Sequence, residues 1–421
     1  MPEKFKLYKK LCQIIIFFYD SSLQFGVCGV NYSRRKDDCS AMKILLGGVP
    51  FGSGNIGDEA ILNCAISIFR RNFPEAELFV ATAAPETAGK YQISALPAYG
   101  FDPRYKMNAF RKELKKFDMF VWAGGTGLSD YPQIGAELLE NAQKLKLKTV
   151  IWQVGMNREF NPQYFQLHGL KLKIADMLGV TGYWEKYLEN RIRERLQVCV
   201  SRCDLVVLRD QPSLIELHNA GEFPAAFYGA DSVVLQQSCE GVLLPPDARS
   251  RRSVAICVAE KLNRSKFLQA VEFFKRLQRE LQVRLVFIPM TAGDRQILKN
   301  LYDALDPAEE NVLIEHTEPE EIQNIIGSCQ LLISGRLQLT VMALNALVPG
   351  IGVANSSKIA NCLSMFGLPV FNNHRSIDFD ALFDECRRWL DEPGFAERAG
   401  NVRKRMLARL EQCEGYLREL F

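Results

Sequence analysis

The 421-residue chain has few of the features that usually reveal a metal site or a nucleic-acid partner. It contains only four histidines, and its formal net charge at pH 7 is +3. A charge so close to zero does not predict binding to nucleic acid. None of the twelve cysteines forms a Cys-x-x-Cys pair, and Cys199 and Cys203, four residues apart, have no histidine nearby. These patterns predict reduced thiols and no metal site.

The amino end lacks an apolar run long enough to cross a bilayer. Residues 1–10 are basic and residues 11–19, LCQIIIFFY, are apolar, but Asp20 ends the run and no small-residue cleavage site follows. A spanning helix needs about 20 apolar residues. We expect residues 1–41 to be a leader that is disordered or results from a misassigned start codon, with a membrane anchor as the less favoured alternative. The expected location is cytoplasmic, with the inner face of the membrane as a second option.

The rest of the chain has the composition of a soluble globular protein, with 48% hydrophobic and 24% charged residues. Its length predicts two domains. Short apolar strands alternate with amphipathic helices, which is typical of α/β domains with parallel sheets. Strands are expected at 43–49, 77–83, 117–125, 148–156, 204–210 and 225–235 in a domain of residues 42–240, with a helical insertion at about 157–200. A second domain, residues 250–376, has strands at 253–259, 284–290, 311–316, 330–335 and 349–354, and residues 377–421 form a helical tail.

A glycine-rich turn links the first strand to the first helix. Its glycines are Gly52, Gly54 and Gly57. Glycine permits positive φ angles and close approach of a ligand to the main chain, and Asn55 or Asp58 can cap the helix that follows. The free N–H groups at this helix end favour a phosphate or carboxylate. The alternative is a capped turn without a ligand, in which Asp58 and Glu59 complement the helix dipole.

Three further strand ends carry polar or glycine-rich sequences. WAGGTGLSD (122–130) contains Gly124, Gly125 and Asp130, LRD (208–210) contains Arg209, and SGRLQ (334–338) contains Arg336. The carboxyl ends of parallel strands gather at one sheet edge, where α/β proteins bind ligands. We expect Arg336 in the first turn of a helix, where a cation opposes the dipole unless an anion lies beside it. An anionic ligand is favoured there over an ion pair, and Lys358, in a polar loop, can reach the same place.

Taken in order, these motifs resemble the polysaccharide pyruvyl transferase family. The residues that carry the resemblance are GNIGDEAIL (54–62), WAGG before an aspartate, LRD followed by SLIELHNAG, GADS (229–232), and SGRLQ with a lysine twenty residues further on. The resemblance spans about residues 42–368. It implies two Rossmann-like domains in a GT-B-like arrangement with a cleft between them. It also implies phosphoenolpyruvate as co-substrate, no further cofactor, an exopolysaccharide or cell-wall saccharide as acceptor, and a pyruvate ketal as product.

The resemblance also assigns roles to single residues. Arg209, Arg336 and Lys358 hold the donor anions together with the amides of the glycine-rich turn, and Asp58, Asp130 or Asp231 contacts acceptor hydroxyls. The remaining substrate-binding candidates are Gly54, Asn55, Gly57, Glu59, Gly124 and Gly125. Where the family pattern has a catalytic histidine, this chain has Gln338, which cannot titrate. Of the four histidines, His168, His218, His316 and His374, only His316 lies at a strand end and is a candidate substitute.

Three functions therefore remain open at the level of sequence. The first is a pyruvyl transferase with a displaced acid, the second a GT-B glycosyltransferase using a nucleotide sugar, and the third a binding relative without turnover. In the helical insertion, Tyr183, Trp184 and Tyr187 either contact a saccharide or lipid-linked acceptor at a membrane surface or pack against one another. The sequence does not predict the oligomeric state.

Overall fold

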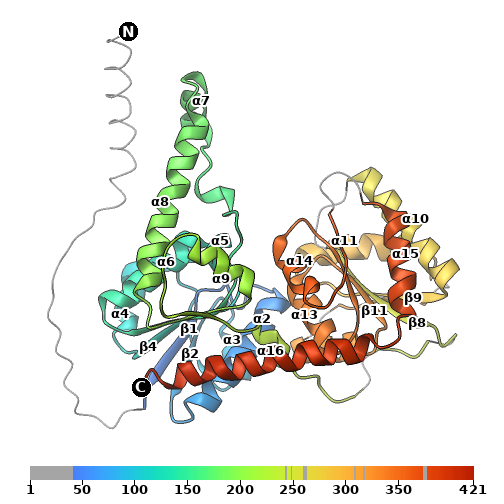
Figure 1. The fold of residues 1–421 in the computed structure, drawn as a ribbon, viewed down its shortest axis with the longest axis horizontal. Coiled ribbons are helices and arrows are strands. Elements are labelled where there is room, and N and C mark those ends of the chain that lie inside the picture. Colours follow the sequence, from blue (N-terminus) through green and yellow to red (C-terminus); the bar gives the residue numbers. More distant parts are fainter. Residues whose placement is uncertain are drawn as a thin grey trace. The chain divides into compact units, whose positions relative to one another are not determined.

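Two parallel β-sheets organise the chain (Figure 1). The structure is a computed structural model, and it describes residues 41–241, 244–247, 249–258, 263–307, 310–315, 318–372 and 377–421. Ala41–Phe421 form one compact unit. The predicted leader, apart from its last residue, lies outside the described residues.

The first sheet has the strand order β3-β2-β1-β4-β5-β6-β7. Its strands are β1 (Lys43–Gly47), β2 (Glu77–Thr82), β3 (Ser94–Pro97), β4 (Met119–Ala123), β5 (Lys148–Val154), β6 (Leu205–Leu208) and β7 (Ala226–Tyr228). All neighbouring strands are parallel, and Leu45 of β1 pairs with Phe79 on one side and Phe120 on the other. Ile44 and Leu45 point into two different apolar clusters, so this sheet is buried on both faces. Nearly continuous apolar strands are typical of that environment.

The second sheet has the order β10-β9-β8-β11-β12-β13 and is also parallel. Its strands are β8 (Arg252–Cys257), β9 (Val283–Phe287), β10 (Val312–Leu313), β11 (Leu331–Ser334), β12 (Gly350–Val353) and β13 (Val370–Phe371). We refer to the part of the compact unit built on the first sheet as the N-terminal half and to the part built on the second sheet as the C-terminal half.

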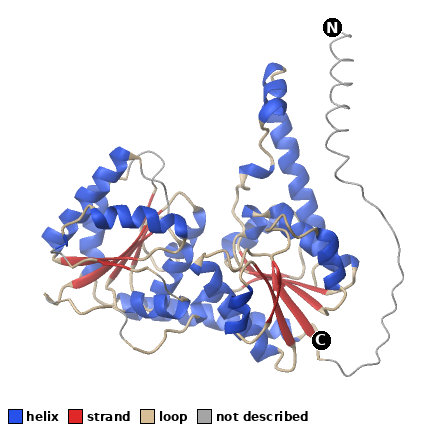
Figure 2. Cartoon of the chain, turned by 180° about the vertical axis from the view of Figure 1, so that it is seen from behind, coloured by secondary structure: helices blue, strands red, loops and turns tan. Residues whose placement is uncertain are grey.

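Helices cover both faces of each sheet (Figure 2). Those of the N-terminal half are α2 (Ile56–Asn72), α3 (Pro85–Lys90), α4 (Met107–Leu114), α5 (Gly127–Asp130), α6 (Pro132–Lys144), α7 (Gly169–Met177), α8 (Thr181–Ser201) and α9 (Gln211–His218). Those of the C-terminal half are α10 (Arg264–Leu281), α11 (Ala292–Asp303), α12 (Pro319–Gly327), α13 (Leu337–Asn345), α14 (Ser357–Ser364) and α15 (Phe379–Leu390). The last helix is α16 (Phe395–Arg418).

Helix α16 joins the two halves, because it runs beneath both sheets and contacts α2, β6 and β7 as well as α13 (Figure 1). Glu414, only 5% exposed, accepts hydrogen bonds from Arg71 and from Asn72, the latter at 2.8 Å. A buried carboxylate needs such partners, because burying a charge without hydrogen bonds or an opposite charge is strongly unfavourable. The carboxyl-terminal segment therefore helps to hold the N-terminal half in place.

Three predictions about strands were wrong in detail. Ser94–Pro97 and Val370–Phe371 form the edge strands β3 and β13, which were not predicted because each is short and has no apolar run of its own. The strand expected over 225–235 ends at Tyr228. Asp231 then accepts a hydrogen bond from the Val233 N–H at 3.0 Å and begins a short 3₁₀ helix, Ser232–Leu235.

The expected helical insertion contains α7 and α8, which form a hairpin that projects from the N-terminal half (Figure 1). Trp184 is buried and packs edge-to-face against Tyr183 and Tyr187, with ring centroids 6.0 and 5.6 Å away. Tyr183 itself is 66% exposed. In this aromatic cluster Trp184 is therefore packed, whereas the two tyrosines are exposed.

Candidate active site

The glycine-rich turn after β1 has most of its N–H groups bonded to the protein itself. Asn55 is the N-cap of α2, and its Oδ1 accepts from the Gly57 N–H at 3.0 Å. The Gly52 N–H donates to Glu59 Oε1 at 2.6 Å, and the Ile56 N–H donates to the Met290 carbonyl of the C-terminal half at 3.0 Å. The geometry is that of a capped strand-to-helix turn, so the cationic side chains nearby, rather than these amides, offer donors to an anion.

Positive φ angles explain two glycines of this turn and two of the turn after β4, but not Gly57, which lies in α2. Gly52 and Gly54 have φ of +75° and +81°, and Gly124 and Gly125 have +79° and +74°. At Gly124 a Cβ would also lie 2.5 Å from Ile61 Cγ2 of α2. Glycine is the residue that adopts this conformation without strain. Gly124 is therefore required for the packing of α2 on the sheet.

Asp58 lies in the first turn of α2, where Asn55 Nδ2 donates to its Oδ2 at 2.9 Å. Burial, together with the neighbouring Glu59 carboxylate, raises the pKa of Asp58 to about 7, although Asn55, Lys358 and Arg336 act in the opposite direction. Burial also raises the pKa of Glu59, which has one oxygen without a hydrogen-bond partner. Asp58 is thus a carboxyl group that exists in both protonation states near neutral pH.

This pKa predicts how stability depends on pH. The folded-state pKa of Asp58 lies above the ordinary value of 3.8, so the protonated form is favoured by folding. Its contribution is complete below pH 4 and is lost as the pH rises through about 7. The difference between pKa values of 3.8 and about 7 corresponds to roughly 4 kcal/mol. We expect the Tm of Asp58→Asn to match wild type at pH 4.5 and to exceed it by several degrees at pH 8 in thermal melts. Equal melting temperatures at both pH values would contradict this.

Asp130, at the end of α5, pairs with Lys358 of the C-terminal half, with Oδ2 and Nζ 3.7 Å apart. The prediction that Lys358 lies in a loop was wrong, because it is the second residue of α14. Burial lowers the pKa of Lys358, and so do Arg209 and Arg336, whereas Asp130 and Asp58 raise it. A cation in a first helical turn, with two guanidinium groups nearby, lies in a positive environment.

Arg336 is the N-cap of α13 and binds the buried Asp294 in a two-pronged ion pair. Its Nε lies 3.0 Å from Oδ2 and its Nη2 lies 2.6 Å from Oδ1, and Nη2 also reaches Thr291 Oγ1 at 3.4 Å. Asp294 thus supplies an anion beside this arginine, within the C-terminal half. The Nη1 group is not used in these bonds, and 34% of the side chain remains exposed. Arg336 is therefore paired with Asp294 and still has guanidinium N–H groups that can donate hydrogen bonds to a ligand.

Arg209 follows β6 and is 5% exposed. Its Nε donates to Asp210 Oδ2 at 3.1 Å and lies 4.0 Å from Asp231 Oδ2. Burial acts to lower the pKa of Arg209, but Asp210 and Asp231 outweigh it and raise the pKa. Its Nη1 is buried without a hydrogen-bond partner among the described residues. A buried unpaired donor is costly unless another group satisfies it.

Of the predicted site residues, the structure brings Asp58, Asp130, Arg336 and Lys358 into electrostatic contact, and Arg209 acts on Lys358 as well. Asp231 instead faces Arg209 and the backbone of the 3₁₀ helix. Gln338, in α13, lies against α2: a Cβ on Gly57 would lie 3.0 Å from its Cβ. The glycine-rich turn and the SGRLQ motif, 280 residues apart in sequence, are therefore neighbours.

The sequence analysis missed the β9–α11 connection as part of this region. Met290, Thr291 and Asp294 come from it, and they bind Ile56 and Arg336. The signal was available, because the sequence TAGD follows an apolar strand and begins a helix in the same way as the other strand-end motifs. Tyr131 was also missed, and its pKa is raised by burial and by Asp58 and Asp130. His316 and His374 lie outside the described residues, and His168 and His218 are exposed.

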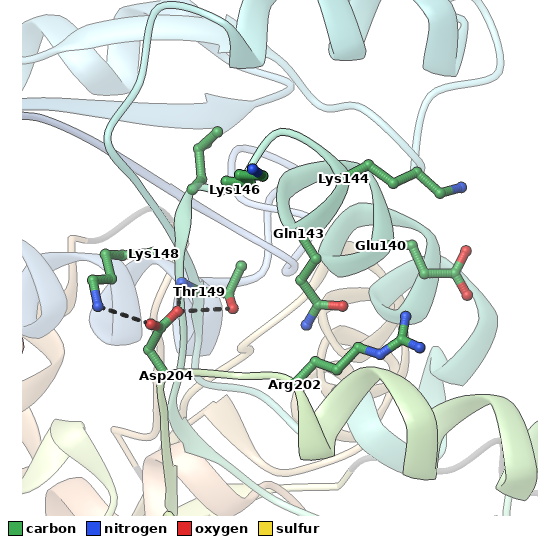
Figure 3. A pocket seen from close by; sticks show the side chains of 9 residues that line it. Glu140, Gln143, Lys144, Lys146, Lys148, Thr149, Arg202 and Asp204 are labelled. Carbon is green, nitrogen blue, oxygen red and sulfur yellow. Dashed lines mark hydrogen bonds and ion pairs between the residues drawn. The ribbon is translucent and has the colours of Figure 1, made fainter. Parts of the chain in front are cut away.

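A pocket of about 450 Å³ lies where strands β5 and β6 begin, at the opposite end of these strands from the candidate site (Figure 3). It is lined by Glu140, Gln143, Lys144, Lys146, Leu147, Lys148, Thr149, Arg202 and Asp204. Lys148 pairs with Asp204 at 3.0 Å, and Lys144 and Arg202 lie at the carboxyl ends of α6 and α8. Cations at helix carboxyl ends complement the dipole. The helix ends therefore explain the positive charge of Lys144 and Arg202 beside this pocket.

Most of the chain also matches a known protein family. Residues 55–357 match the sequence profile of the polysaccharide pyruvyl transferase family, which is more than two thirds of the chain. The chain belongs to the polysaccharide pyruvyl transferase family. The prediction of a pyruvyl transferase is confirmed at this level, and the protein is a transferase. Of the three cations, Arg209 and Arg336 fall inside the match and Lys358 follows its last residue.

Solved structures of other proteins show the same fold as this chain. It is similar to the kitacinnamycin glycotransferase (TM-score 0.55, 11% identity, 90% of this chain and 99% of that one). It is also similar to Staphylococcus aureus MnaA with UDP (0.53, 9%, 88% and 96%) and to Anabaena HepE with UDP and glucose (0.52, 13%, 90% and 99%). These likenesses confirm the predicted GT-B-like α/β fold.

Among the described residues, no group of three or more histidine, cysteine or acidic side chains is arranged to hold a metal ion. The nine cysteines in this part of the chain are free thiols. None of the helices between residues 41 and 421 that the structure describes combines the length and apolarity needed to cross a bilayer.

Proposed function

We propose that the protein transfers the pyruvyl group of phosphoenolpyruvate to two hydroxyls of a saccharide, forming a ketal during cytoplasmic assembly of an exopolysaccharide or cell-wall glycan. The observation that carries the proposal is the meeting of three cations from both halves. Arg209, Arg336 and Lys358 each lie at the amino end of a helix, α9, α13 and α14 respectively. Helix amino ends and guanidinium groups both attract phosphate and carboxylate.

The donor chemistry fits the state of these three cations. Phosphoenolpyruvate carries a phosphate and a carboxylate. Burial lowers the pKa of Lys358 most, and Arg209 and Arg336 lower it further, so an anion beside Lys358 would favour its charged form. Arg209 Nη1, which has no hydrogen-bond partner among the described residues, and the partly exposed guanidinium of Arg336 are suitable donors. Gly54, Asn55, Gly57, Glu59, Gly124 and Gly125 shape the turns around this place, and Asp130 is the proposed contact to an acceptor hydroxyl.

The acceptor in this proposal is a lipid-linked glycan at the inner face of the membrane. The α7–α8 hairpin supports it, because Leu170, Met177 and Tyr183 on it are 73%, 78% and 66% exposed. Exposed apolar and tyrosine side chains on a projecting helix suit a lipid interface, and Lys173 and Lys186 lie on the same hairpin. Soluble and lipid-linked glycans are therefore separate arms of the assay below.

The function is tested by thermal shift followed by turnover. We expect phosphoenolpyruvate to raise the Tm, whereas UDP and GDP leave it unchanged, and we expect phosphate release that depends on an added glycan. Soluble and lipid-linked glycans are added in separate assays, and we expect faster release with the lipid-linked glycan. Stabilisation by a nucleotide diphosphate instead of phosphoenolpyruvate would favour a glycosyltransferase. Donor binding without phosphate release from any glycan would favour a binding protein.

A further inference from the structure

Gln338 occupies the motif position where a proton-transferring side chain is expected, and its amide cannot titrate. The groups around Gln338 therefore determine whether another side chain can transfer the proton. The side chain of Gln338 rests on the first turn of α2, because a Cβ on Gly57 would lie 3.0 Å from Gln338 Cβ and 3.1 Å from its Cγ. The residue that follows Gly57 is Asp58. A carboxyl group thus lies in the turn that Gln338 touches.

Asp58 is held in a defined position. Asn55 Nδ2 donates to Oδ2 at 2.9 Å, and the helical turn fixes the backbone, since the Asp58 N–H donates to the Asn55 carbonyl at 3.0 Å. Oδ1 is not used in the Asn55 contact. Lys358 and Arg336 from the C-terminal half act on this carboxyl electrostatically. The group therefore lies beside the cations that we assign to the donor.

We propose that Asp58 is the catalytic acid and base of this transferase, in place of the family's histidine. The inference rests on the proposed function, because it assigns the proton transfers of that reaction. Charged and titratable groups surround Asp58 from every element packed against it: Glu59 on its own helix, Tyr131 and Asp130 after β4, and Arg336 and Lys358 at the amino ends of α13 and α14.

The ionisation of Asp58 suits this role. Burial and the Glu59 charge raise its pKa to about 7, so a large fraction is protonated at neutral pH and the conjugate base is also accessible. A general acid works best when its pKa lies near the working pH.

The chemical step balances with this one carboxyl. Protonated Asp58 gives its proton to the methylene carbon C3 of phosphoenolpyruvate, which becomes a methyl group while positive charge develops at C2. The first sugar hydroxyl forms a C–O bond to C2 and returns its proton to the Asp58 carboxylate. Phosphate then leaves with the electrons of its C2–O bond, the second hydroxyl attacks C2, and the proton of that hydroxyl ends on the phosphate. No oxidant or additional proton is needed.

The test compares the full-length wild type with Asp58→Asn, which keeps the size of the side chain but cannot exchange a proton. Melting temperature establishes folding, calorimetry with phosphoenolpyruvate gives the donor Kd, and glycan-dependent phosphate release between pH 5.5 and 9 gives kcat and KM. We expect wild-type kcat/KM to fall above about pH 7. We expect Asp58→Asn to lower kcat at least 100-fold, to change the donor Kd less than 3-fold, and to lose the fall above pH 7.

Asp130→Asn is the matched control, since it neutralises another acid beside Lys358. Whatever the value of its kcat, the kcat/KM of Asp130→Asn should still fall above about pH 7. The double variant Asp58→Asn/Gln338→His should recover at least a tenth of the wild-type kcat, because it restores a titratable group at the neighbouring position. A double variant no more active than Asp58→Asn would count against the proposal.

Failure of this inference is distinguishable from failure of the proposed function. If wild type turns over and folded Asp58→Asn turns over equally, the assignment of Asp58 is wrong and the function stands. If Asp58→Asn loses donor binding as well as turnover, Asp58 holds the donor instead of moving a proton. If wild type neither binds phosphoenolpyruvate nor releases phosphate, the proposed function itself is wrong.

Discussion

Replacing Arg336 with methionine is expected to lower kcat/KM for phosphoenolpyruvate by about 10²–10³-fold. Truncating one partner of a buried, hydrogen-bonded charge pair costs roughly 2–5 kcal/mol, and each 1.4 kcal/mol is a factor of ten. In this case the substitution removes the guanidinium from two partners. One is the proposed donor anion, and the other is Asp294, which is 1% exposed. The readouts are glycan-dependent phosphate release and calorimetry with phosphoenolpyruvate.

Asp294 makes the result interpretable, because it lets stability be separated from donor binding. Arg336→Met leaves its carboxylate buried and unpaired, which should lower the free energy of unfolding by about 3–5 kcal/mol. The double variant Arg336→Met/Asp294→Leu removes both charges and should regain most of that stability without regaining donor affinity. A double variant that binds phosphoenolpyruvate within 3-fold of wild type would exclude Arg336 from the donor site.

Replacing Arg209 with methionine is expected to produce a loss of stability as large as that of Arg336→Met. Arg209 is 5% exposed and lies between two carboxylates, Asp210 at 3.1 Å and Asp231 at 4.0 Å. Its removal leaves both carboxylates without their cation, at a cost of about 3–5 kcal/mol. For a chain of this size we expect a fall in Tm of roughly 5–15 °C at pH 7.5. Arg209→Lys, which keeps the charge, should lose less than half as much.

Arg195 offers a matched control for this stability measurement. It pairs with Glu140 through two bonds of 2.8 and 2.9 Å, but both side chains are about a quarter exposed and lie away from the proposed site. Because neither carboxylate nor guanidinium of this pair is fully buried, its loss should cost less than the roughly 3–5 kcal/mol expected where a buried carboxylate loses its cation. Arg195→Met should therefore lower Tm by no more than a few degrees and leave donor binding intact. If Arg209→Met were no more damaging than Arg195→Met, Arg209 would not be the central cation that we describe.

The sequence alone predicts the parts of the fold and site that depend on local chemistry. The apolar run of β1, the glycine-rich turn and the cap at Asn55 follow from residues within about 20 positions of one another, and the structure has all three. The parallel pairing of the strands also follows from alternating strands and helices. Each sheet gathers its strand ends at one edge, but Asp130 and Lys358, 228 positions apart, belong to different sheets and meet only because of how the halves pack.

The remainder could not be predicted because it depends on contacts between the halves. The amide of Ile56 is satisfied by a carbonyl of the C-terminal half, and no local signal reveals that. The ion pair between Arg336 and Asp294 requires knowing that the β9–α11 and β11–α13 connections are adjacent. The raised pKa of Asp58 results from burial and from the neighbouring Glu59, and it persists although Lys358 and Arg336 of the C-terminal half act to lower it. Edge strands β3 and β13 are too short to produce a hydrophobic pattern.

The central claim is that cations from both halves hold a small molecule with two anionic groups. The most direct measurement is calorimetric titration of the wild type with phosphoenolpyruvate, repeated with pyruvate and with inorganic phosphate, each of which carries one of the two groups. We expect phosphoenolpyruvate to bind at one site per chain, at least tenfold more tightly than either fragment, with an affinity that falls as salt is raised. Absence of binding, or equal affinity for phosphate alone, would contradict the claim.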